Sequence, residues 1–206
     1  MENKQELFEK APVWKAYFII SLPVVFSMLV TLIYNMVDTF FVSGTQNADL
    51  VAGVSQCTPL FTLMLALGDI FGLGGSSIIS RLFGQKDDAT AKNVSGFCFY
   101  AAIISGLIVT GLMFLFQTPI LKMLGATDST VKYASQYYFF IAWGAPLIIL
   151  SLTPSNIIRT EGLALQSMIA SVAGSIVNIA LDPLFIFTFK MGAGGAALAT
   201  VMGYVL

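Results

Sequence analysis

The stretch from Trp14 to Val42, WKAYFIISLPVVFSMLVTLIYNMVDTFFV, decides the fold class, because nearly every residue in it is apolar or small. It is longer than the ~20 residues that a helix needs to cross a bilayer core. Asp38 is the exception. A carboxylate at the centre of such a span costs about 2.5–3.5 kcal/mol on insertion scales, so an intramembrane acid normally has a partner, a cation or a proton. The central question is therefore what Asp38 is paired with.

The composition of the whole chain agrees with this stretch. Of its 206 residues, 57% are hydrophobic and 10% are charged, whereas soluble domains carry roughly 25% charged residues. The chain has no histidine, which removes the commonest general base and metal ligand. Cys57 and Cys98 stand alone in apolar runs, so we expect buried free thiols. These features predict an integral membrane protein that is not an enzyme and needs no cofactor.

Six apolar runs predict an all-α bundle of transmembrane helices. They span about 14–43, 50–80, 94–117, 131–155, 163–189 and 193–206. The first five are long enough to cross, and the sixth stops after ~14 residues, which is too short. We therefore expect residues 1–206 to form one transmembrane lobe whose sixth helix is truncated.

The distribution of Lys and Arg predicts the orientation, because cytoplasmic loops are enriched in these residues. With the N-terminus inside, seven of the ten become cytoplasmic: Lys4, Lys10, Lys15, Arg81, Lys86, Lys92 and Arg159. Lys122, Lys132 and Lys190 remain outside. We expect a multi-pass protein of the plasma (inner) membrane with a cytoplasmic N-terminus.

Polar residues from three of these runs fall at one depth. At ~1.5 Å of rise per residue, Asp38, Asp182 and Thr200 lie in the same outer layer, and Asn178 is one helical turn from Asp182. Two carboxylates, an amide and a hydroxyl make an oxygen-rich site for a hard cation such as Na+ or for a shared proton. The alternative is a hydrogen-bonded network that only holds helices together.

Three further polar residues and one proline have open roles. Tyr34 and Asn35 precede Asp38 by one turn, and we expect them on its face. Asp69, among glycines, is either a substrate-facing acid for a cationic cargo or a partner for a polar group on another helix. Pro23 removes a backbone hydrogen bond and is either an ordinary membrane proline or a hinge.

Two other patterns favour packing. The tract GAGGAALAT from Gly192 to Thr200 resembles a phosphate loop only superficially, because no βαβ unit precedes it. We expect it to pack helices closely. The aromatic cluster from Tyr137 to Trp143 predicts packing and anchoring at the membrane interface.

Four segments resemble the multidrug and toxic compound extrusion (MATE) transporters: LIYNMVDTFFVSG, SRLFGQKD, IIRTEG and VNIALDPLFIF. The resemblance covers essentially the whole chain and implies one lobe of a twelve-helix fold that exports organic cations in exchange for Na+ or H+. It also implies that Asp38, Asn178, Asp182 and Thr200 form the cation site and that Pro23 bends the first helix. Asp69 matches no general family feature.

The resemblance leaves two alternatives and several open points. A flippase for lipid-linked saccharides should have a basic cavity, which the spans of this lobe lack. A membrane scaffold or receptor could use the acids to join helices. The expected partners are cationic small molecules, the bilayer and a carboxy-terminal lobe, with no nucleic acid. The sequence does not distinguish Na+ from H+, name the cargo or give the oligomeric state.

Overall fold

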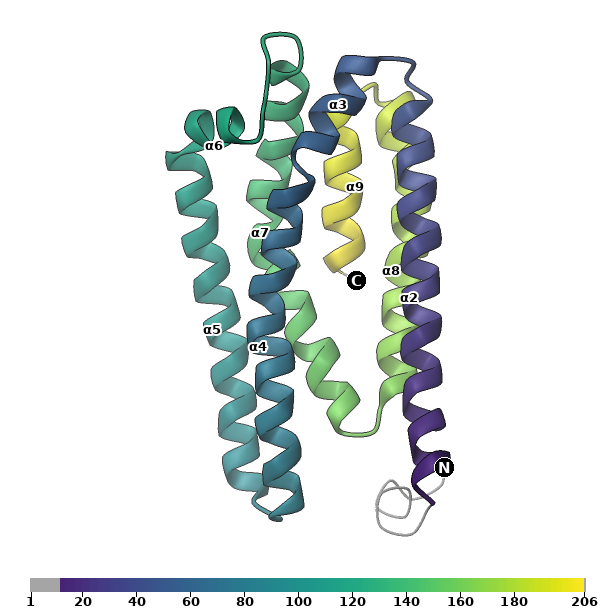
Figure 1. Cartoon of the computed structure of the whole chain (residues 1–206), viewed down its shortest axis with the longest axis vertical. Helices are drawn as coiled ribbons and strands as arrows, with labels where there is room; N and C mark the ends of the chain where they lie inside the picture. The colour runs from purple at the N-terminus through teal and green to yellow at the C-terminus, as the bar shows by residue number, and fades with distance from the viewer. Residues whose placement is uncertain (1–11, 206) are drawn as a thin grey trace.

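The computed structural model describes residues 12–205, and this part of the chain is an all-α bundle (Figure 1). The helices are α2 (Val13–Ser43), α3 (Ala48–Gln56), α4 (Thr58–Gly84), α5 (Asp88–Leu115), α6 (Gln117–Met123), α7 (Val131–Thr160), α8 (Ala164–Pro183), the π-helix η1 (Leu184–Thr188) and α9 (Ala193–Val205). Five spans are long and apolar enough to cross a membrane. The predicted all-α membrane fold is confirmed. Lys4, Lys10 and Leu206 lie outside the described residues.

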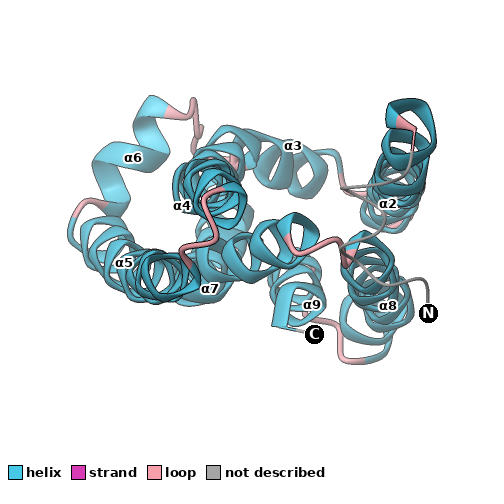
Figure 2. Ribbon diagram, turned by 90° about the horizontal axis from the view of Figure 1, so that it is seen from below, coloured by secondary structure: helices cyan, strands magenta, loops and turns pink. Residues whose placement is uncertain are grey.

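The long helices run side by side in alternating directions, and α7 is the centre of the bundle (Figures 1 and 2). α4 and α5 pack against one side of α7, and α9 packs against another. α2 and α8 form a pair, and α9 joins this pair to α7 by contacting α8 as well. Because α7 is enclosed, Tyr138, Ile141 and Ile148 are completely buried, whereas most of α2 is exposed.

The second predicted run is two helices instead of one. α3 ends at Gln56, and α4 begins at Thr58 with Pro59 in its first turn. Proline has no backbone N–H to donate to the preceding turn, so it fits without loss in the first turn of a helix, where that N–H would have no partner, and Pro59 favours a new helix start here. The predicted run over 50–80 is therefore one candidate span, Ala48–Gly84, built from two helices and not from one continuous helix. Figure 1 shows α3 inclined to α4 at the end of the bundle.

The third predicted run begins earlier than its apolar residues. α5 starts at Asp88 because Asp87 caps it: the Thr90 N–H donates to Asp87 Oδ1 at 3.0 Å, and the Thr90 hydroxyl donates to Oδ2 at 2.7 Å. Outside the span, these bonds hold the pKa of the Asp87 carboxyl below its usual value. After α5, the short helix α6, which was not predicted, lies across the end of the bundle (Figures 1 and 2).

The fourth and fifth runs are shaped by prolines. α7 continues to Thr160, includes Pro146 and Pro154, and changes direction along its length (Figure 1). α8 ends at Pro183, and the backbone continues as the π-helix η1, in which the Phe189 N–H donates to Leu184 O at 2.9 Å. π-Helical turns are rare and occur frequently at functional sites. This one begins two residues after Asp182.

Glycines bring the helix backbones close together. A Cβ added at Gly106 would lie 2.5 Å from Pro146 Cα, and one added at Gly174 would collide with the Gly203 carbonyl oxygen. In the glycine tract, Gly194 lies against the Phe140 ring and Gly195 against the backbone of Phe185. The tract forms the start of α9 and packs helices together, as predicted.

The contact between Gly174 and Gly203 provides a test of this packing. Gly174→Ala should lower the melting temperature, because the new methyl group forces α8 and α9 apart; overpacking of this kind costs about 1–3 kcal/mol. Gly74→Ala is the matched control, since nothing lies within 4 Å of its added Cβ. Thermal unfolding in detergent measures both. Equal melting temperatures for the two variants would show that the close approach is not required.

Candidate functional site

Four polar residues predicted to form a site lie on three helices that pack together. Asp38 is on α2, Asn178 and Asp182 are on α8, and Thr200 is on α9. Asn178 and Asp182 are four residues apart and therefore share one face of α8. Asp182 is 0% exposed, Asn178 2% and Thr200 4%, while Asp38 is half-buried. Because α8 contacts both α2 and α9, the bundle holds these groups at one level.

The two carboxylates lie close enough to act on each other. The charge of Asp38 acts directly on the Asp182 carboxyl. Two like charges out of water repel strongly, because the surroundings screen them poorly. An arrangement that holds both acids together is therefore at its most stable when a proton or a cation reduces their combined charge.

Several side-chain atoms of this cluster lack a partner within the protein. Both carboxylate oxygens of Asp182, both amide atoms of Asn178 and Oδ1 of Asp38 are buried without a hydrogen bond. A buried polar atom left unpaired costs about 1–3 kcal/mol, and more when it is charged. Four of these five atoms are oxygens. The Thr200 hydroxyl donates to Ala196 O at 3.0 Å, which leaves its oxygen lone pairs available.

This donor set fits a hard cation or a proton better than it fits a transition metal. Carboxylate, amide and hydroxyl oxygens are the ligands of hard cations, whereas zinc and copper sites use histidine and cysteine. Among residues 12–205, no three His, Cys, Asp or Glu side chains gather in a metal-binding group. The four residues can thus hold Na+ or share a proton.

Two tyrosines lie near Asp38, and a third lies beside one of them. The Tyr34 and Tyr204 side chains are hydrogen-bonded to each other, and the Tyr137 hydroxyl is hydrogen-bonded to Thr200. The charge of Asp38 acts on both Tyr34 and Tyr137. Phenol hydroxyls both donate and accept, so these groups can stabilise either charge state of the acids. Tyr34 was expected here.

Tyr137 and Tyr204 were missed as site residues. Tyr137 was expected only to pack with other aromatic residues, and that interpretation was incomplete. Tyr138 does pack, with its hydroxyl donating to Met113 O at 2.6 Å. Its neighbour Tyr137 lies near Asp38 and Thr200. No sequence signal separates the two. Tyr204 did have one, because it follows Thr200 by four residues and therefore lies on the same face of α9.

Asn35 does not join the cluster. Its side chain is exposed and lines a shallow surface hollow of about 400 Å3 with Leu32, Met36 and Thr39. The expectation that it shares the face of Asp38 was wrong. Residues three apart are separated by about 60° around a helix of 3.6 residues per turn, and here that rotation turns Asn35 away from α8.

Asp69 lies apart from the acids of α2 and α8 and has a partner on another helix. Its Oδ1 accepts a hydrogen bond from Asn156 Nδ2 on α7 at 3.4 Å, and its charge acts on Arg159. Of the two roles considered, the polar partner is present. Because Asp69 is hydrogen-bonded to a neutral amide and is only half-buried, a role in cargo binding stays open.

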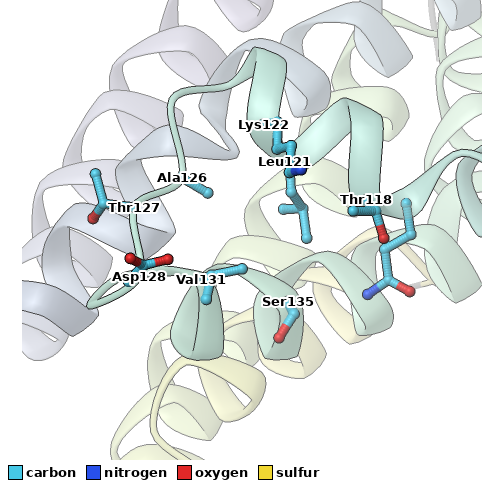
Figure 3. Close-up of a pocket in the computed structure, with 9 residues that line it drawn as sticks. Thr118, Leu121, Lys122, Ala126, Thr127, Asp128, Val131 and Ser135 are labelled. Atoms are coloured by element: carbon cyan, nitrogen blue, oxygen red, sulfur yellow. The ribbon is translucent and has the colours of Figure 1, made fainter.

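A second hollow contains none of the predicted residues. It has a volume of about 320 Å3 and lies between α6 and the start of α7, where Leu121 and Val131 face its interior (Figure 3). Thr118, Lys122, Asp128 and Ser135 contribute polar groups around it (Figure 3). The candidate ion site is instead the buried cluster between α2, α8 and α9.

Comparison with known proteins gives consistent matches. The MatE family model matches residues 23–184. The multidrug export protein MepA of Staphylococcus aureus (strain NCTC 8325 / PS 47) is 36% identical over 198 residues, which are 96% of this chain and 44% of MepA. A crystal structure of MATE in the straight conformation superposes with a TM-score of 0.91 at 33% identity, covering 100% of this chain and 45% of that one.

A crystal structure of MATE in the bent conformation superposes with a TM-score of 0.88 at 32% identity, with the same coverage of 100% and 45%. The chain therefore spans less than half the length of these relatives. The TM-score is 0.91 against the straight form and 0.88 against the bent one, so the fold matches both.

Asp182→Asn tests whether the cluster binds a cation or a proton. A ligand that binds only the folded state stabilises it by about 2.7 kcal/mol at one hundred times its Kd. We expect the melting temperature of the wild type to depend on Na+ or on pH, and Asp182→Asn to fold without this dependence. Asp128→Asn, at an exposed loop acid, is the control. A wild-type melting temperature that is indifferent to both ions would contradict the assignment.

Proposed function

Because the chain belongs to the MatE family of multidrug transporters, which are membrane proteins and not enzymes, we propose that it is one lobe of a secondary antiporter. The antiporter exports organic cations in exchange for Na+ or H+, and its coupling ion binds among Asp38, Asn178, Asp182 and Thr200. The observation that carries this proposal is the set of buried, unpartnered oxygens on α2 and α8.

The proposed setting follows the positive-inside distribution of Lys and Arg. The N-terminus lies in the cytoplasm, the protein lies in the plasma membrane, and the cluster is nearer the outer surface. A carboxy-terminal lobe completes the transporter, since the chain matches 44% of MepA. The transporter needs no cofactor besides the coupling ion.

Exchange requires that the ion and the cargo favour different states of the lobe, because a ligand shifts an equilibrium only through its differential affinity. A cation or proton that enters the cluster reduces the repulsion between Asp38 and Asp182. This change lets the α2–α8 contact rearrange. The lobe then binds cargo in one state and releases it in the other, as coupled exchangers do around a fixed site.

α2 has the construction of a helix that can bend. Pro23 cannot donate a backbone hydrogen bond, Ser27 Oγ donates to Pro23 O at 3.0 Å, and Thr31 Oγ1 donates to Ser27 O at 2.9 Å. Hydroxyls that donate to the carbonyl one turn earlier weaken and bend helices. Pro23, Ser27 and Thr31 are spaced four residues apart, so the weakened backbone positions lie along one side of α2. The same helix carries Asp38.

Asp38→Asn tests the coupling. In vesicles containing the full-length protein, this variant should fold yet lose efflux of a cationic dye driven by either a Na+ or a proton gradient, because the cluster no longer holds a charge that the ion must balance. Whichever gradient drives the wild type identifies the ion. Asp49→Asn, at an exposed acid on α3, should transport normally.

Two outcomes would contradict the coupling proposal. Wild-type efflux by Asp38→Asn would remove Asp38 from the mechanism. Absence of flux in the wild type under both gradients, with a stability that does not respond to either ion, would favour a membrane scaffold.

Pro23→Ala tests the hinge. Alanine restores the backbone donor and favours the straight helix, so we expect the variant to bind the coupling ion with unchanged affinity but to transport at least about tenfold more slowly, equivalent to about 1.4 kcal/mol in the barrier. Pro59→Ala, at the first turn of α4, is the matched control. Wild-type transport by Pro23→Ala would show that α2 need not bend at this point.

A further inference from the structure

Asp69 is one end of a chain of polar side chains that joins α4, α7 and α8. Asn156 Nδ2 donates to Asp69 Oδ1 at 3.4 Å, and Arg159 Nη1 donates to Asn156 Oδ1 at 3.4 Å. Arg159 Nε donates to Ser167 Oγ on α8 at 2.9 Å, and Ser167 Oγ lies 2.8 Å from Ser155 Oγ. This polar network lies where α7 ends and α8 begins, away from the cluster around Asp182.

The two charged residues of this network, Asp69 and Arg159, attract each other but do not share a short hydrogen bond. Charge-assisted hydrogen bonds between N and O are normally about 2.7–2.9 Å long, yet Asp69 receives a bond of 3.4 Å from a neutral amide. The short bond of Arg159 goes to a neutral hydroxyl. The charge of Asp69 still acts on Arg159. Asn156 therefore lies between the two charged groups and bonds to both. We infer that the positive charge of Arg159 only partly balances the Asp69 carboxylate.

The packing of α4 on α7 holds Asn156 in place between the charges. A Cβ added at Gly72 would lie 2.7 Å from Asn156 Nδ2, and one added at Gly68 would lie 2.8 Å from Ile149 O. Asn156 Nδ2 also donates to Leu152 O at 3.0 Å, and Asn156 is only 8% exposed. Asp69 itself is half-buried, so its carboxylate remains reachable from outside the helix contact.

We propose that Asp69 is a cargo-binding carboxylate for lipophilic organic cations and that Arg159, acting through Asn156, is a built-in competing cation. The proposal rests on the function proposed above, because it names the residue of this lobe that binds the proposed organic-cation cargo. A cation that reaches Asp69 makes the direct charge contact that Arg159 does not make. When the cargo leaves, the Asn156 relay again compensates Asp69. Arg159 therefore limits how tightly the lobe holds its cargo.

The test is equilibrium binding of tetraphenylphosphonium to the full-length protein in detergent, with no ion gradient. Asp69→Asn should weaken binding about tenfold or more, because an unscreened ion pair is lost. Arg159→Gln should tighten binding several-fold, because the competing charge is removed. The double variant should bind like Asp69→Asn. Asp49→Asn is the exposed-acid control, and Nile red, which is uncharged, should bind all variants equally.

Several results would overturn the proposal. Tetraphenylphosphonium affinity unchanged in Asp69→Asn, with a lowered melting temperature, would show that the network only joins helices. If Asp69→Asn does not fold, Arg159→Gln decides alone: unchanged or weaker binding overturns the proposal. Tetraphenylphosphonium binding is measured without a coupling ion. It therefore still tests the role of Asp69 if the proposal for Asp38 fails.

Discussion

The repulsion between the Asp38 and Asp182 carboxylates is the constraint on which the rest of this lobe depends. Asp182 is completely buried and feels the charge of Asp38 across the contact between α2 and α8. The fold holds them together through packing, since Gly174 and Gly203 bring α9 against α8 and carry Thr200 to the same level. The π-helix η1 begins immediately after Pro183, the residue that follows Asp182. In the proposed mechanism, a bound cation or proton relieves this repulsion.

The proposed exchange uses two acidic positions with different surroundings. The cluster around Asp182 has buried oxygens without partners, which suits a small ion that has lost its water. Asp69 is half-buried, with a relayed cation nearby, which suits a large lipophilic cation. α7 contributes Tyr137 near Asp38 and Asn156 next to Asp69, so it contributes residues near both positions.

Much of this arrangement could be predicted from the sequence, and the remainder could not for physical reasons. The long helices follow from the hydropathy runs, whereas the membrane depths of Asp38, Asp182 and Thr200, counted along straight helices, stay a prediction. Rotation about a helix axis is set by packing, so Tyr137 and Asn35 were misassigned. α6 is too short for a periodic signal, and the break at Cys57 required recognition that Pro59 begins a helix.

The central claim is that Asp38 and Asp182 hold one ion together. The most direct measurement is a double-mutant cycle on Asp38→Asn and Asp182→Asn, read as affinity for the coupling ion in the full-length protein. Because each acid is required for the same site, we predict that either single variant loses most of the affinity and that the double variant loses little more. Losses that add independently would contradict the account, since each acid would then bind its ligand alone.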